Sequence, residues 1–223
     1  MKPKSFVFTW VGIIIFAVLV GLLTKFSYQD NNSDAHEKIN EFSVAQTSID
    51  WENSEWKNAQ QLADEAEYIF IVKKAGQSTF LYHATLTPVE VVHVFKSNEE
   101  DFLGEQLYLF EPSFVLFEFE RYFPHNSYNM MLDDSEYLVF LNRRTFPEGY
   151  VPNDVEKHSY LFTTNCALSK YLLNNSFQND ILYDDGTNIK YNEINLLEII
   201  VYDKKQLDYY NRFKEEIVAN YKQ

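Results

Sequence analysis

The chain has 223 residues, of which 46% are hydrophobic and 17% aromatic, and its formal net charge is -14. This apolar content is sufficient for a hydrophobic core, so the composition excludes an intrinsically disordered chain. The negative charge argues against nucleic acid as a partner, because binding a phosphate backbone requires Lys and Arg to neutralise it. The single cysteine, Cys166, excludes an intramolecular disulfide, and we interpret it as a small buried hydrophobe.

An uncharged apolar run from Phe6 to Leu23 predicts a transmembrane helix, since about 18–20 residues are needed to cross a bilayer. Two lysines precede the run and the chain becomes acidic after it, which places the N-terminus in the cytoplasm. We therefore expect residues 1–26 to be a cytoplasmic stub and a single-pass signal-anchor in the cell membrane. A cleavable signal peptide is the alternative, but it would have a shorter apolar stretch followed by a small-residue cleavage site.

Residues 27–54 are polar and rich in Asn and Asp, which predicts a tether between the anchor and an extracytoplasmic domain at 55–223. Four side chains of the tether could be pictured as metal ligands, but a solvated linker gives them no fixed geometry. We therefore predict no metal site there. These side chains are Asp30, Asp34, His36 and Glu37.

The outer domain reads as mostly β, within an α+β class. A short helix is followed by an apolar run, and then by a longer run that alternates apolar and polar residues until Pro88 interrupts it. Since proline cannot donate to a ladder, the longer run is either two strands or one strand bent by a bulge. The expected elements are a helix at Trp56–Ala66 and strands at Tyr68–Val72, Thr79–Lys96 and Gln106–Phe110.

The segments ADEAEYIFIVKK, VEVVHVFKSN, LGEQLYLFEP and DDSEYLVFLN, in this order, carry a resemblance that covers roughly Leu62 to Asn142. The chain resembles OB-like barrel domains related to the inhibitor domain of the metalloproteinase inhibitors, which recur on the outside of Gram-positive bacteria. The resemblance implies an OB-like small β-barrel. Two departures affect the loops: Ser97 stands where such domains commonly have a glycine, and 112–131 is additional.

This additional stretch is the most aromatic part of the domain, which leaves two interpretations open. In the first, Phe114 to Glu120 forms a further strand that covers the mouth of the barrel. In the second, an insertion on a barrel is a recognition surface. Its exposed partner-binding residues would then be Tyr122, Phe123 and His125.

The C-terminal third predicts four further elements. A glycine in the DDG segment at 184–186 indicates the turn of a terminal hairpin, and apolar residues spaced by three and four after it indicate an amphipathic helix that packs on the barrel or docks on a partner. The elements are a strand at Tyr160–Thr163, a helix at Ala167–Leu173, a hairpin of Ile181–Tyr183 with Thr187–Lys190, and a helix with Leu207, Tyr210, Phe213 and Ile217 on its apolar face.

No motif with defined chemistry is present in the sequence. The glycines are too scattered for a phosphate-binding loop, and no histidine has a second His or Cys at metal-ligand spacing, so we expect no cofactor and no metal. We expect a non-enzymatic, membrane-tethered interaction module that binds another envelope protein, an exported peptide or toxin, or a protease. The alternative is a cell-wall-directed hydrolase that uses dispersed carboxylates. A third possibility is a subunit of a membrane complex held through Ala17 and Gly21.

Overall fold

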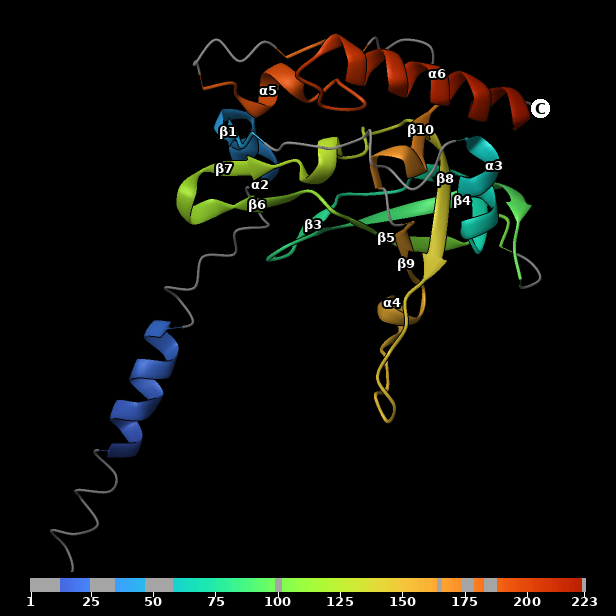
Figure 1. The fold of residues 1–223 in the computed structure, drawn as a ribbon. Helices are drawn as coiled ribbons and strands as arrows, with labels where there is room; N and C mark the ends of the chain where they lie inside the picture. Colours follow the sequence, from blue (N-terminus) through green and yellow to red (C-terminus); the bar gives the residue numbers. More distant parts are fainter. Residues whose placement is uncertain are drawn as a thin grey trace, which may run out of the picture. The chain divides into compact units, whose positions relative to one another are not determined.

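The computed structural model describes residues 13–24, 35–46, 58–98, 102–163, 166–173, 179–182 and 188–221 (Figure 1). The chain divides into two units, Met1–Ala35 and His36–Gln223. In the first unit, 13–24 is helical and its large apolar side chains are exposed, with Phe16 at 68%. Within the described ranges, no helix has both the length and the apolar character that crossing a membrane requires. Residues 6–12 of the predicted span lie outside those ranges.

The second unit is an α+β domain built on a closed five-stranded barrel. Around the barrel the order is β2-β4-β5-β9-β8, and β8 pairs again with β2. Only β5 and β9 run parallel, and the other neighbouring strands are antiparallel. This closed order is consistent with an OB-like barrel. The strands are β2 (Tyr68–Lys74), β4 (Thr85–Lys96), β5 (Gln106–Glu111), β8 (Glu136–Arg143) and β9 (Ser159–Phe162).

The apolar run of β2 is continuous because both of its faces are buried. Tyr68, Phe70 and Val72 belong to the core inside the barrel. Ile69 belongs to a second core outside the wall, where α3 (Ala59–Glu65) and α6 (Lys204–Asn220) pack. Successive side chains of a strand point to opposite faces, so a strand covered on both sides carries no polar alternation.

Pro88 lies within β4, which continues unbroken through it. The separate short strand β3 (Thr79–Phe80) pairs with the start of β4. The strands β2 and β4 pair as far as Lys74 and Val89. Pro88 lies just beyond this last pair, so β2 does not need a backbone N–H from it. Its carbonyl still accepts a hydrogen bond from the Ala75 N–H, at 2.9 Å. The register shifts lie farther along β4, away from the proline.

The aromatic insertion forms a second, smaller sheet. The predicted strand at 114–120 is shorter than expected, since a 3-10 helix, η2 (Phe117–Phe119), replaces its second half. The strand order of this sheet is β1-β7-β6, with β1 (Ser43–Val44), β6 (Phe114–Leu116) and β7 (Arg121–Phe123).

Part of the predicted tether is folded, which corrects that prediction for residues 36–46. This segment contains α2 (Ala35–Lys38), η1 (Ile39–Glu41) and the strand β1, and it buries Ile39 and Phe42. The composition is polar, but the buried side chains and the pairing of β1 with β7 hold the segment against the domain. Residues 27–34 and 47–54, on either side of this folded piece, lie outside the described ranges.

Near the C-terminus, the predicted helix at 167–173 is instead η4 (Cys166–Ser169) followed by β10 (Lys170–Leu172), which pairs with β8. Two residues from the flanks of the predicted hairpin pair elsewhere. Ile181 forms a β-bridge with Val201, and Lys190 forms one with Ser43. The DDG turn itself and the Cys166 side chain lie outside the described part of the chain. The remaining short elements are η3 (His125–Ser127), α4 (Asp154–Lys157) and α5 (Tyr191–Ile194).

The C-terminal amphipathic helix, α6, is confirmed and packs on the domain. Figure 1 shows it lying across β10, and Tyr210, Phe213 and Ile217 are buried in the outer core with residues of α3 and β8. The Asp203 side chain caps its N-terminus by accepting a hydrogen bond from the Gln206 N–H at 2.8 Å. The apolar face that the sequence predicts is thus used internally.

Candidate functional site

Two adjoining pockets lie beside the loop that joins β2 to β3. The larger has a volume of about 690 Å³ and the smaller about 350 Å³, within the size range of ligand sites. Both are lined by His36, Lys74 and Asp133, so these three residues mark the boundary that the pockets share. Each comes from a different segment: α2, the end of β2, and the loop before β8.

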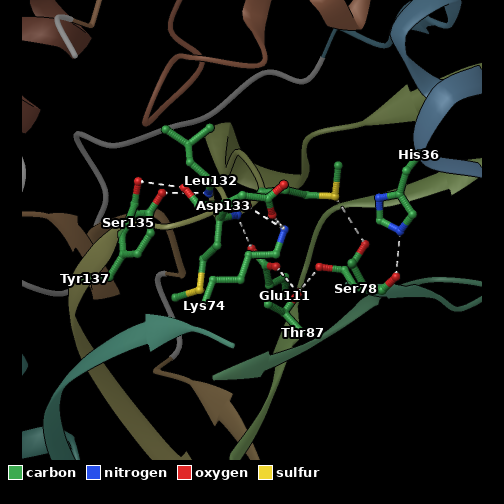
Figure 2. Close-up of polar contacts among 12 residues, drawn as sticks. His36, Lys74, Ser78, Thr87, Glu111, Leu132, Asp133, Ser135 and Tyr137 are labelled. Atoms are coloured by element: carbon green, nitrogen blue, oxygen red, sulfur yellow. Dashed lines mark hydrogen bonds and ion pairs between the residues drawn. The ribbon is translucent and has the colours of Figure 1, made fainter. Parts of the chain in front are cut away.

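Lys74 is the fixed cation of the site. Only 9% of its side chain is exposed, whereas the side chain of its partner Asp133 is 84% exposed. The Lys74 Nζ lies 2.6 Å from Asp133 Oδ1 and donates a hydrogen bond to the Met131 carbonyl at 3.3 Å. Figure 2 shows this ammonium group between the loop and the barrel. The pair therefore joins a buried cation to a carboxylate that stands in water.

The loop that carries Asp133 is anchored at both ends. The Leu132 N–H donates to the Tyr137 hydroxyl at 2.8 Å, and the Ser135 hydroxyl donates to the Asp133 carbonyl at 3.3 Å (Figure 2). Burial raises the pKa of Tyr137, so its hydroxyl stays neutral in this role. The anchors hold the loop backbone, while the Asp133 side chain points into solvent.

A buried polar network lies beneath the pockets and ends at Glu111. This carboxylate is fully buried and accepts hydrogen bonds from the Thr87 hydroxyl, the Tyr128 hydroxyl (2.8 Å) and the Met131 N–H (2.8 Å). Three donors satisfy a carboxylate in a core. Glu111 therefore fixes the Met131 backbone, against which Lys74 is placed.

The network reaches the smaller pocket through Ser78. Its hydroxyl lies 2.8 Å from the Thr87 hydroxyl. Thr87 has a single hydroxyl hydrogen, which it donates to Glu111, so Ser78 donates to Thr87. The Ser78 oxygen is then left with lone pairs that can accept a hydrogen bond from a ligand in the pocket that it lines.

His36 closes one side of both pockets. Its Nε2 lies 2.9 Å from the Ser78 carbonyl oxygen, so this nitrogen carries the hydrogen and donates. Its ring centroid lies 4.9 Å from that of Phe80. The contact ties α2 to the loop after β2, which explains how a residue of the predicted tether becomes part of the site.

Half of the residues that line the smaller pocket are apolar, and two adjacent methionines are among them. Methionine side chains are flexible and polarisable and adapt to ligands of different shape. The apolar residues of the wall are Ile39, Phe80, Met130, Met131, Leu132 and Leu196.

The residues predicted to bind a partner occupy different environments. Tyr122 is fully buried, its hydroxyl donates to Asn129 Oδ1 at 2.9 Å, and this corrects the expectation that it is an exposed contact. Its position on β7 turns it towards the domain. Phe123 is half-buried, with its ring stacked on that of Phe114 at 5.0 Å, and His125 is exposed. Neither of these two lines the pockets.

Sequence reasoning missed Lys74, Asp133, Ser78 and Glu111. For Glu111 a signal existed, since Gln106–Glu111 alternates and Glu111 falls on the same face as Leu107 and Leu109. A carboxylate at an inward position requires buried partners. Lys74 and Asp133 carry no such pattern, because only the closure of the barrel brings them together.

No protein-family model matches the chain, and no curated protein is significantly similar to it. Among the described residues, no group of three His, Cys, Asp or Glu side chains is arranged to hold a metal ion.

Proposed function

We propose that this protein is a membrane-anchored, non-enzymatic interaction module that holds a segment of an extracytoplasmic partner in the two pockets at His36, Lys74 and Asp133. The observation that carries the proposal is the composition of the smaller pocket. Apolar side chains line it together with polar groups that include His36, Lys74 and Ser78, and such a combination is found in binding sites. The partner would be another envelope protein or an exported peptide, and a protease is one class within that range.

The charges around the site favour binding over hydrolysis. Glu111 is enclosed in the barrel and saturated by three donors, so it is not positioned to exchange protons with a substrate. Asp133 and Asp134 are mostly exposed, with side chains at 84% and 93%. A glycosidase needs two carboxyl groups held at a set separation across the substrate. The cell-wall hydrolase is therefore the weaker alternative.

The anchor part of the proposal rests on the apolar run at 6–23. The helix at 13–24 exposes large apolar side chains one after another, from Ile13 at 52% to Leu23 at 67%. An apolar surface of this extent requires cover by lipid or protein. The lysines before it and the acidic chain after it support an outward-facing domain.

Crosslinking in the native membrane tests the proposal. The full chain would be purified in mild detergent after brief crosslinking, and its partners identified by mass spectrometry. Leu196→Glu places a charge at the wall of the smaller pocket, and because Leu196 is 58% exposed the fold should be retained. We expect this variant to lose a partner that the unchanged chain captures stoichiometrically.

The matched control is Val151→Glu, which adds the same charge at a residue that is 86% exposed and lies outside both pockets. It should capture the partner normally. Equal capture by Leu196→Glu would contradict the placement of the site. Recovery of the protein alone, together with release of sugars or peptides from cell-wall fragments, would favour the hydrolase.

A further inference from the structure

The ion pair at the boundary of the pockets is asymmetric. The Lys74 ammonium is held by the Met131 carbonyl and has little access to water, whereas Asp133 already stands in solvent. Asp133 can turn away into water, but the largely buried Lys74 ammonium would then lack a counter-charge, so the exchange requires a second carboxylate in its place. Lys74 cannot withdraw in the same way, since its ammonium would remain largely buried. An incoming carboxylate can therefore replace Asp133 at Lys74.

The smaller pocket determines what the carboxylate is attached to. A group bound at Lys74 lies at the edge of the 350 Å³ pocket, whose wall includes Phe80, Met130 and Met131. An apolar substituent would remove this wall from water, and this favours binding in proportion to the apolar area that is buried. The Ser78 hydroxyl oxygen adds an acceptor for an N–H group next to the carboxylate.

The larger pocket determines the charge of the rest of the ligand. Its lining includes three acidic side chains, Glu90, Asp133 and Asp134. When the ligand's carboxylate pairs with Lys74, Lys73 is the lysine of this lining that remains to balance them. The whole chain carries a net charge of -14, which repels ligands that are anionic throughout. Basic groups upstream of the bound carboxylate would pair with the acidic side chains. The site is thus suited to a ligand with an anionic apolar end and a cationic body.

We infer that the ligand of this site is the C-terminal end of a peptide chain whose last residue is apolar and whose preceding residues include basic ones. The terminal carboxylate pairs with Lys74, the last side chain fills the smaller pocket, and the basic residues lie in the larger pocket. This inference rests on the proposed function and names the partner segment that the module holds. Capture of a chain terminus by its carboxylate is an established mode of peptide recognition.

Binding of a short peptide to the full chain in detergent tests the inference. The probe is acetyl-Lys-Lys-Gly-Leu with a free C-terminal carboxylate, and the comparison is the same peptide with a C-terminal amide, both measured by calorimetry. We expect the amide to bind at least about tenfold more weakly, because it loses a charge-assisted hydrogen bond at a shielded cation. Equal affinity of the two peptides would overturn the inference.

Two lysine variants localise the effect. Lys74→Met should weaken binding of the free-carboxylate peptide about tenfold. Lys157→Met, the matched control, removes a lysine whose side chain is 52% exposed and which lies outside both pockets, and it should leave the affinity within about twofold. Thermal unfolding of both variants would confirm that they fold. Unchanged binding by folded Lys74→Met would overturn the inference.

A small acid separates a peptide end from a free apolar acid. Asp133→Asn removes the competing carboxylate and should tighten binding of 4-phenylbutyrate, which has no cationic group. If 4-phenylbutyrate binds the unchanged chain as tightly as the peptide, the peptide assignment is overturned.

The two proposals can fail separately. If Leu196→Glu abolishes partner capture but the free-carboxylate and amide peptides bind alike, the inference fails and the proposed function stands. If capture is unaffected and no probe binds, both fail.

Discussion

On β10, a lysine lies beside Tyr128 and Tyr137 of the barrel core, where an apolar residue would otherwise be expected. Lys170 is 1% exposed, donates a hydrogen bond to the Asn129 carbonyl, and has its ammonium 4.0 Å from the centroid of the Tyr128 ring. Burial lowers the pKa of Lys170 to about 8. Buried carboxylates at Glu111 and Glu198 oppose this shift, and Lys74 and Lys214 reinforce it.

Lys170→Met should change how stability depends on pH. In the folded chain Lys170 releases its proton near pH 8, and in the unfolded chain near 10.5, so the unfolded state binds more protons between these values. The free energy of unfolding therefore gains a contribution that rises with pH across this window, by about 3 kcal/mol in total. Urea unfolding at several pH values from 7 to 10.5 would measure it.

The comparison with Lys170→Met isolates this contribution. The buried tyrosines Tyr171 and Tyr210, whose pKa values burial raises, titrate in both proteins and cancel in the difference. We expect the rise to be absent in Lys170→Met, because methionine has no group that titrates. A parallel pH dependence in the two proteins would show that Lys170 keeps its ordinary proton affinity.

At the scale of single elements, α6 is docked by a buried ion pair as well as by its apolar face. The Lys214 Nζ lies 2.6 Å from Glu198 Oε2, and the Glu198 side chain is 1% exposed. Glu198 also accepts a hydrogen bond from the Leu172 N–H, which connects the helix to β10. The pair therefore fixes the position of α6 along the strand.

Lys214→Met should destabilise the domain by about 3 kcal/mol, because it leaves the buried Glu198 carboxylate without its cation. Lys204→Met on the same helix is the matched control, since the Lys204–Asp208 pair is exposed, with side chains at 78% and 59%. The control should change the free energy of unfolding by less than about 0.5 kcal/mol. Chemical denaturation measures both, and similar losses in the two variants would contradict the role of the pair.

Lys96 has a structural role that explains why the VEVVHVFK segment of the OB-like resemblance ends in a lysine. Lys96, the last residue of β4, donates to the Ala63 and Ala66 carbonyls at 2.9 and 2.5 Å. Carbonyls at the C-terminal end of a helix have no partner within the helix, so Lys96 caps α3. The lysine of the VEVVHVFK segment thus has a structural role in joining α3 to the barrel.

At the scale of the whole molecule, the predicted anchor can be tested directly. Replacing Ile14 and Val18 together by Lys places two charges in the apolar run, each of which costs about 2.5–3.5 kcal/mol at the centre of a membrane helix. We expect this variant to leave the membrane pellet on alkaline washing. Replacing the same residues by Leu keeps the run apolar, and this control should stay in the pellet. Retention of the lysine variant would contradict a spanning anchor.

The folded unit depends on two cores that share one barrel wall. In β8, Tyr137, Val139 and Leu141 face the barrel interior, whereas Leu138 and Phe140 face the outer core beneath α6. A mutation in this strand therefore affects the inner core at an odd-numbered residue and the outer core at an even-numbered one. The same arrangement explains why YLVFL, at 137–141, reads as an uninterrupted apolar run.

The sequence by itself determined the features that depend on neighbouring residues. The apolar run of β2, the strand at Gln106–Phe110 and the helical spacing of Tyr210, Phe213 and Ile217 in α6 are each read locally, and all three elements are confirmed. The resemblance also anticipated a small barrel, which the closure of β8 onto β2 and β9 confirms. The helix at 167–173 failed because pairing with β8 outweighed the local helical preference.

Only the tertiary structure decided the site and the role of the insertion. His36, Lys74 and Asp133 are far apart in the chain, and nothing in their local sequence indicates that they meet. Tyr122 looked exposed because an aromatic insertion suggested a surface, yet the face of β7 that is buried depends on what packs against it. The physical reason is that periodicity reports which side chains share a face, whereas long-range packing decides which face is covered and which residues meet across it.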